Sequence, residues 1–281
     1  MRLNLQLFLM NKRIRNKLEK QRLEATPETI LKKYKDKELF EILETTNLSD
    51  FCEWNAFWGR LALKSSVELY PEVKKALIYI IENYKKQRKN NPDKYGYMHC
   101  IETASLLAEH WFYEPDQIAA ALLHDVREDI PNWEEYLKWN YNQHIVQLVK
   151  ELTEKDKSWD TPEQGKATWK ERKLEEMEKV SHFVPETLAL KLWDQISNIA
   201  ETVNDLKKLS PEGRQKYREN FNAGYDKQIW KYSTLNDIIQ KRIQTCKEEH
   251  LFQNEDEEKN LQQFADSFQW LVNTLKWLMN N

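Results

Sequence analysis

The chain has 281 residues, a length that suits one or two domains. Its 43 lysines and arginines nearly balance its 46 aspartates and glutamates, giving a formal net charge of -3. This charge balance argues against nucleic-acid binding. Only five residues are glycine, which argues against sheet-rich folds with many tight turns and against glycine-rich nucleotide loops. No run of 18 apolar residues occurs, so we expect no transmembrane helix and no membrane partner.

The N-terminal segment lacks the pattern of a secretory signal. Its first ten residues are mostly apolar but are interrupted by Asn4 and Gln6, and a basic stretch at residues 12–22 follows. A signal peptide carries its positive charges first and has a longer apolar region. We therefore expect a cytoplasmic protein that starts at Met1 or Met10. The basic stretch is interpreted as a solvated helix face, with contact to an acidic partner as the alternative.

Helical spacing of apolar residues runs through most of the chain. Prolines stand at several expected helix starts, where their missing backbone N–H costs nothing. The expected helices begin at Pro71, cover residues 101–108 and 118–123, run from Pro185 to Leu206 and from Pro211 to Ile243, and finish with residues 255–278. No alternating strand of four or more residues occurs beyond the first seven, so the sequence predicts an all-α fold.

The last expected helix carries apolar residues in alternating steps of three and four, which is a heptad stripe. The stripe consists of Leu261, Phe264, Phe268, Leu271, Leu275 and Leu278. It can pair with another subunit, which would give a homo-oligomer, or pack on the chain's own core. We expect helical extensions at residues 1–66 and 211–281, on either side of a domain at residues 67–210.

Two features argue against other chemistries. The three cysteines, Cys52, Cys100 and Cys246, are far apart and include no CxxC pair, which indicates reduced thiols rather than a disulfide frame or a zinc knuckle. Gly165-Lys166 matches part of a phosphate-binding loop, but the rest of that pattern is missing.

The chemically informative segment is His124-Asp125-Val126-Arg127-Glu128-Asp129, which directly follows the apolar run at residues 118–123. Helical spacing would place His124 and Glu128 on one face, with Asp125 and Asp129 beside them. Like charges 4 Å apart repel by about 4 kcal/mol per pair at an effective dielectric constant of 20. Such a cluster either has raised pKa values or binds a cation. A metal is the simpler solution, because histidine and aspartate are both available as ligands.

Two further polar residues interrupt apolar helical patterns. His99 stands at the start of the expected helix 101–108, and Asp194 lies midway along an apolar helix, where a charged group needs a partner or a metal. Each of them alone is more often a capping or solvated residue. The ordered set of His99, then His-Asp-x-x-Glu-Asp, then Asp194 is what indicates a metal site.

This ordered set resembles the HD-domain metal phosphohydrolases, and most of all the hydrolase domain of the RelA/SpoT alarmone family, especially its small stand-alone hydrolases. The resemblance covers about residues 71–206. The matching elements are Arg88-Lys89, His99, the signature at 124–129, Trp169-Lys170-Glu171-Arg172-Lys173, and Lys191-Leu192-Trp193-Asp194-Gln195-Ile196-Ser197-Asn198. The resemblance implies an HD-domain helical bundle and an enzyme that removes the 3′-pyrophosphate of (p)ppGpp-like nucleotides.

Position by position, the resemblance also implies the roles of the site residues. His99, His124, Asp125 and Asp194 would bind a divalent metal, with manganese expected, and Glu128 and Asp129 would be the catalytic carboxylates. Arg88 and Lys89 would line the nucleotide pocket, and Asn198 would contact ribose or phosphate. The chemistry is consistent, because a metal lowers the pKa of its bound water and a carboxylate can take or orient the proton.

The sequence departs from the family pattern at four positions. Gly96 replaces a tyrosine, Cys100 a proline and Gln195 an arginine, and Glu201 stands where a small hydroxyl residue is common. A carboxylate at position 201 would repel a pyrophosphate. One alternative that stays open is therefore an HD phosphohydrolase acting on another nucleotide, such as a nucleoside monophosphate or NADPH. The other, based on the extensions at residues 1–66 and 207–281, is a non-catalytic nucleotide-sensing or antitoxin-like interaction protein.

Overall fold

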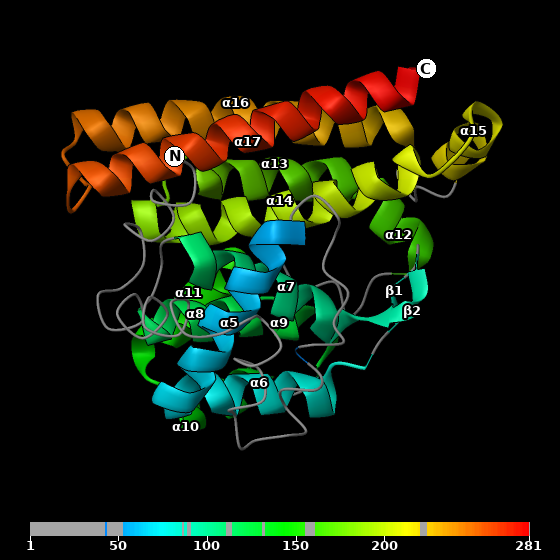
Figure 1. Cartoon of the computed structure of the whole chain (residues 1–281). Helices are drawn as coiled ribbons and strands as arrows, with labels where there is room; N and C mark the ends of the chain where they lie inside the picture. The colour runs from blue at the N-terminus through cyan, green and yellow to red at the C-terminus, as the bar shows by residue number, and fades with distance from the viewer. Residues whose placement is uncertain are drawn as a thin grey trace. The chain divides into compact units, whose positions relative to one another are not determined.

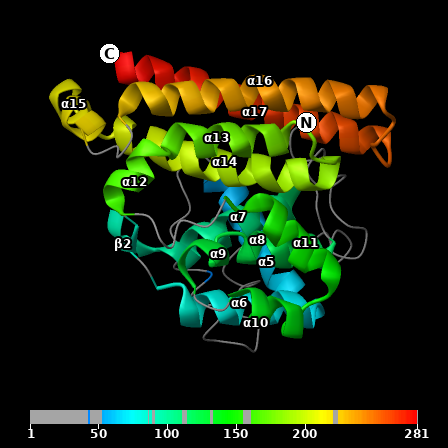
Figure 2. The same ribbon diagram turned by 180° about the vertical axis from the view of Figure 1, so that it is seen from behind.

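The computed structural model describes residues 43, 53–85, 87–88, 91–110, 114–130, 133–154, 161–219 and 224–280. The chain divides into two compact units between Lys150 and Glu151. Helices dominate both units (Figure 1, Figure 2), which confirms the all-α prediction apart from one short hairpin. Among the described helices, none combines the length and the apolar character that a membrane crossing requires. The basic stretch at residues 12–22 lies outside the described residues.

The first unit is built around one helix that is buried along almost its whole length. Its helices are α5 (Glu53–Leu69), α6 (Pro71–Asn83), α7 (Gly96–His110), α8 (Pro115–Leu123), α9 (Val126–Asp129), α10 (Trp133–Asn140) and α11 (Gln143–Leu152), the last of which contains the division between the units. Both α6 and α7 pack against α8, and α5 packs against α7. Seven consecutive residues of α8, from Gln117 to Leu123, are buried. Because each buried Leu or Ile contributes about 1.5–3 kcal/mol, α8 anchors the segment that follows it.

A short antiparallel hairpin precedes α7. Strand β1 (Gln87–Arg88) pairs with β2 (Asn91–Tyr95), with Gln87 opposite Tyr95. The sequence did not predict these strands, because the segment has no alternation of apolar and polar residues. Strand β2 leads directly into Gly96, where an added Cβ would lie 2.3 Å from the Tyr84 ring. Glycine at position 96 therefore leaves room for Tyr84 at the start of the helix that carries His99.

The second unit consists of packed helices. They are α12 (Pro162–Ala167), α13 (Trp169–Val180), α14 (Pro185–Lys207), α15 (Pro211–Glu219), α16 (Tyr225–Glu248) and α17 (Glu255–Asn280). Helix α17 runs alongside α16 (Figure 1) and packs against α14, α15 and α16. All six residues of the heptad stripe are buried, and Phe264 contacts Trp193 of α14 with 4.6 Å between ring centroids. The stripe thus packs on the chain's own core, which is one of the two alternatives that the sequence left open.

The prediction of a single helix from Pro211 to Ile243 is wrong, because the structure has two helices, α15 and α16, in this range. Gly224 immediately precedes α16 and has a φ of 82°. Glycine adopts positive φ without the steric cost that a Cβ would add. The predicted domain boundaries after residues 66 and 210 stay predictions.

Candidate metal centre and its supporting network

His124 and Asp125 lie in a turn between two helices of the first unit. Helix α8 ends at Leu123 and α9 begins at Val126. The helical spacing predicted for the segment 124–129 is therefore interrupted at Asp125, whose φ of -92° and ψ of -5° belong to a turn conformation. This turn, rather than a continuous helix face, brings the imidazole and the neighbouring carboxylate together.

Three of the predicted metal ligands meet in this unit. Nε2 of His124 lies 3.2 Å from Oδ1 of Asp125, and Nε2 of His99 lies 3.9 Å from Oδ2 of the same carboxylate. The two imidazole rings are 5.2 Å apart between centroids. Ligand atoms that each bond one metal at about 2.0–2.2 Å are separated by roughly 3–4 Å. Each histidine thus lies at about this distance from one oxygen of the Asp125 carboxylate, His99 from Oδ2 and His124 from Oδ1.

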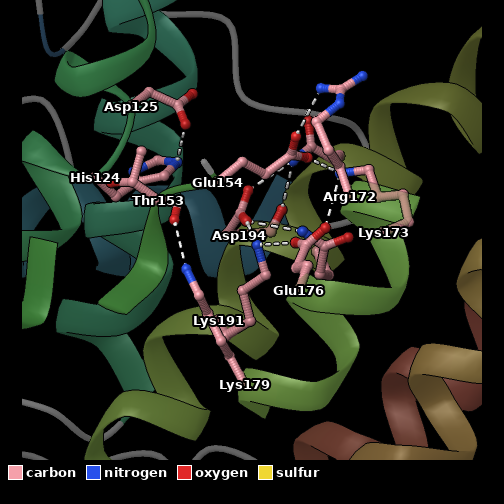
Figure 3. A network of polar contacts seen from close by, with 12 residues as sticks. His124, Asp125, Thr153, Glu154, Arg172, Lys173, Glu176, Lys179, Lys191 and Asp194 are labelled. Atoms are coloured by element: carbon pink, nitrogen blue, oxygen red, sulfur yellow. Dashed lines mark hydrogen bonds and ion pairs between the residues drawn. The ribbon is translucent and has the colours of Figure 1, made fainter. Parts of the chain in front are cut away.

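The hydrogen bonding of His124 leaves the right nitrogen for a metal. Nδ1 of His124 lies 2.8 Å from the carbonyl oxygen of Ala121. Because a carbonyl can only accept, Nδ1 must carry the proton and donate it. The atom that could bind a metal is then Nε2, which is the nitrogen that faces Asp125 (Figure 3). A backbone carbonyl that accepts from the other ring nitrogen and so fixes the tautomer is usual for metal-binding histidines.

The histidines and the aspartate differ in exposure. His99 and His124 are each 4% exposed, whereas the side chain of Asp125 is 26% exposed. The two imidazoles are thus shielded from solvent, and the carboxylate is the member of the group that water or a substrate can approach.

Asp194 lies in α14 of the second unit, buried as the sequence predicted, and its carboxylate is held by three residues of its own helix. Oδ2 accepts hydrogen bonds from Nζ of Lys191 at 3.0 Å and Nε2 of Gln195 at 2.7 Å, and Oδ1 accepts from Nδ2 of Asn198 at 2.6 Å. A buried carboxylate needs such donors to remain charged. These contacts therefore fix the orientation of the Asp194 carboxylate.

Sequence reasoning did not assign this orienting role to Lys191 and Gln195. The signal in the sequence that could have suggested this role is position: Lys191 lies three residues before Asp194 and Gln195 one residue after it, on the same helix. Asn198 also serves Asp194, and its predicted contact with ribose or phosphate stays a prediction.

A chain of buried ion pairs extends from Asp194 into α13 (Figure 3). Nζ of Lys191 lies 2.5 Å from Oε1 of Glu176, and Oε2 of Glu176 lies 2.7 Å from Nζ of Lys173. Lys173 and Arg172 both pair with Glu154. Burial alone would raise the pKa of Glu176, but the positive charges of Lys191 and Lys173 outweigh it and hold this pKa well below its ordinary value. The network ties α13 to α14 and supports the Asp194 carboxylate.

The Trp-x-x-Arg-Lys segment lies at a helix start, since α13 begins at Trp169. Its Arg172 also donates to the carbonyl oxygen of Gly165 at 2.8 Å. This motif therefore begins the helix whose Arg172 and Lys173 belong to the ion-pair network.

For the remaining predicted site residues, the structure describes the backbone alone or nothing. Glu128 and Asp129 lie in α9, and Arg88 lies in β1. Their side chains, and the whole of Lys89, lie outside the described part of the chain. The catalytic role of the two carboxylates and the substrate-binding role of the two basic residues stay predictions.

Comparisons with known proteins agree with this arrangement. Residues 76–223, more than half of the chain, match the family model described as HD domain. The guanosine-3′,5′-bis(diphosphate) 3′-pyrophosphohydrolase MESH1 of Xenopus tropicalis is 31% identical over 147 residues, which are 51% of this chain and 75% of that protein. The Homo sapiens protein of the same name is 28% identical over 142 residues, 50% of this chain and 72% of its own. The matched family region contains His99, His124, Asp125 and Asp194.

Proposed function

The chain belongs to the HD-domain family, and we propose that it is a metal-dependent phosphohydrolase that cleaves the 3′-pyrophosphate from (p)ppGpp-like nucleotides. The observation that carries this proposal is the meeting of His99 and His124 with Asp125, with Nε2 of His124 facing the carboxylate. The relatives named as 3′-pyrophosphohydrolases support the substrate class. A cytoplasmic location stays a prediction.

For the metal centre, we propose four ligands: His99, His124, Asp125 and Asp194. Histidine nitrogens with carboxylate oxygens suit several divalent transition ions, and manganese is the ion that the family resemblance favours. A bound divalent ion would supply Lewis acidity and a water of lowered pKa. The orientation of Asp194 by Lys191, Gln195 and Asn198 supports its place in the ligand set.

The other proposed roles concern protons and the nucleotide. Glu128 or Asp129 takes the proton of the attacking water, a contribution of roughly 10²–10⁴-fold. Arg88, Lys89 and Asn198 hold the nucleotide and stabilise negative charge on its phosphates. The water oxygen bonds to the phosphorus that is attached to the 3′ oxygen. The bond between this phosphorus and the 3′ oxygen breaks. Pyrophosphate and a nucleotide with a free 3′-hydroxyl are released.

One residue favours a second candidate substrate. Glu201 places a carboxylate on α14, seven residues after Asp194, where a pyrophosphate would be repelled. The reactive group of a nucleoside monophosphate, or the 2′-phosphate of NADPH, is a single phosphate, whose smaller negative charge would be repelled less than that of a 3′-pyrophosphate.

A nucleotide panel separates these readings. Purified protein supplemented with Mn²⁺ would be incubated with ppGpp, pppGpp, nucleoside monophosphates and NADPH, and chromatography would resolve pyrophosphate from orthophosphate. We expect pyrophosphate from ppGpp and pppGpp, and no product with His124→Ala. Orthophosphate from a monophosphate or NADPH would establish the second candidate. Binding of ppGpp without any product across the panel would contradict the enzymatic proposal and favour an interaction protein.

A further inference from the structure

We propose that Cys100 is an additional ligand of the metal centre, and that zinc and cobalt ions recruit its thiolate whereas manganese does not. The proposal rests on the metal centre of the proposed function and extends it to metal selection.

The position of Cys100 gives the first argument. One donor atom each from Cys100, His124 and Asp125 lie within 4.8 Å of one another. Cys100 is fully buried in α7, next to His99 in sequence. Zinc bonds sulfur at about 2.3 Å and histidine nitrogen at about 2.0–2.1 Å, so ligands of one tetrahedral ion lie roughly 3.5 Å apart. A small movement of side chains would thus place the three donors around one ion.

The chemistry of the donors gives the second argument. Thiolate is a soft ligand that zinc and cobalt accept, whereas manganese prefers oxygen and nitrogen ligands. His124 and Asp125 are common to two possible sets, since His99 adds a nitrogen and Cys100 adds a sulfur. The ion that occupies the centre therefore selects the set. The RelA/SpoT pattern has proline at this position, so a thiol here distinguishes this chain from that pattern.

A second cysteine provides a matched control. Cys246 is also buried, but it lies in α16 of the second unit, where its Sγ lies 3.8 Å from the Phe183 carbonyl oxygen. The third cysteine, Cys52, lies outside the described residues. Replacing both in the variant Cys52→Ser/Cys246→Ser leaves Cys100 as the single thiol among the three cysteines of the chain.

X-ray absorption on that double variant tests the proposal directly. The full chain would be stripped of metal and loaded without oxygen with one equivalent of Zn²⁺ or Mn²⁺. We expect a sulfur scatterer at about 2.3 Å from zinc and only nitrogen and oxygen neighbours around manganese. The cobalt-loaded protein should show a thiolate-to-metal charge-transfer band in the near ultraviolet. A zinc spectrum without sulfur would overturn the proposal, and this measurement requires no substitution of Cys100.

Metal competition gives an independent readout. Cys100→Ser and Cys100→Ala should weaken zinc binding by about tenfold or more and leave manganese binding nearly unchanged, with folding checked by circular dichroism. Cys246→Ser should alter neither affinity. An equal loss for both ions would show a merely structural role and overturn the proposal. Sulfur ligation in a protein that hydrolyses no nucleotide would contradict the proposed function alone, whereas hydrolysis without sulfur ligation would contradict only the role of Cys100.

Discussion

At the scale of single residues, the chemistry of the first unit depends on which nitrogen of His124 carries the proton. The bond from Nδ1 to the Ala121 carbonyl oxygen settles this and directs Nε2 toward Asp125. The buried imidazoles and the partly exposed carboxylate then form a group that can hold a cation while leaving one side accessible. A proton acceptor for the attacking water must come from outside this group, which is the role proposed for Glu128 or Asp129.

The first prediction concerns Glu128. Glu128→Gln should keep the affinity for Mn²⁺ and lower the turnover of ppGpp by roughly 10²–10⁴-fold, because an amide keeps the shape of the side chain but cannot take a proton. Turnover would be measured at known metal occupancy. Glu135→Gln, an exposed position in α10, should leave the rate unchanged. An undiminished rate in Glu128→Gln would remove this residue from the mechanism.

At this scale the ordered residue types singled out His99, His124 and Asp125, and the structure places these side chains close together. Their role as metal ligands stays a prediction. The orienting role of Lys191 and Gln195 could not be predicted, because it depends on the side-chain directions on α14. The space that Tyr84 takes beside Gly96 was equally hidden, since it requires knowing that two separate segments meet.

At the scale of elements, α13 and α14 are joined through charge rather than through apolar contact alone. Lys173 and Glu176 form an ion pair within α13, and Glu176 also pairs with Lys191 of α14, so that pair joins the two helices. Removing one member of a buried ion pair leaves its partner uncompensated, which typically costs about 3–5 kcal/mol.

The second prediction follows for Glu176→Gln. Its free energy of unfolding at pH 7 should fall by about 3–5 kcal/mol relative to wild type, as measured in urea. The folded-state pKa of Glu176 lies below its ordinary value of 4.5, so the unfolded chain binds more protons as the pH falls. The stabilisation is therefore complete above this ordinary value and is lost as the pH falls toward the folded-state pKa.

The difference between wild type and Glu176→Gln should accordingly narrow in acid. Glu171→Gln, an exposed position on the same helix, is the matched control and should change neither the stability nor its dependence on pH. A difference that stayed constant through the acid range would contradict the assigned role of the ion pairs.

The third prediction distinguishes the two faces of α17. Phe268 is fully buried and lies 6.3 Å from Tyr232 of α16 between ring centroids, whereas Trp277 is 60% exposed. Phe268→Ala should lower the free energy of unfolding by about 3–5 kcal/mol, because it opens a cavity. Trp277→Ala should change it by no more than about 0.5 kcal/mol. Similar losses in the two variants would show that the stripe is not the packed face.

Element boundaries show where sequence patterns reach their limit. The apolar period predicted the helix from Pro185 and the last helix well, because both have long one-sided stripes. The same apolar period continues across Gly224, whose positive φ immediately before α16 cannot be read from that period. The break at Asp125 was missed because His-Asp-x-x-Glu-Asp has a spacing that is compatible with a continuous helix.

At the scale of the whole molecule, the chain contains an HD domain and further helices on either side of it. The matched family region, residues 76–223, continues beyond the predicted end of the domain at residue 210. The C-terminal helices α16 and α17 pack on α13 and α14 of their own unit, so they stabilise the helix that carries Asp194. Formation of a homo-oligomer stays a prediction.

The most direct test of the central claim is the rate of pyrophosphate release from ppGpp as metal-stripped protein is titrated with Mn²⁺. We predict no turnover without metal, a rate that rises with occupancy and saturates near one ion per chain, and neither tight binding nor turnover in Asp125→Ala. Asp237→Ala, an exposed position in α16, should behave as wild type. Full activity in the metal-stripped protein or in Asp125→Ala would contradict the account.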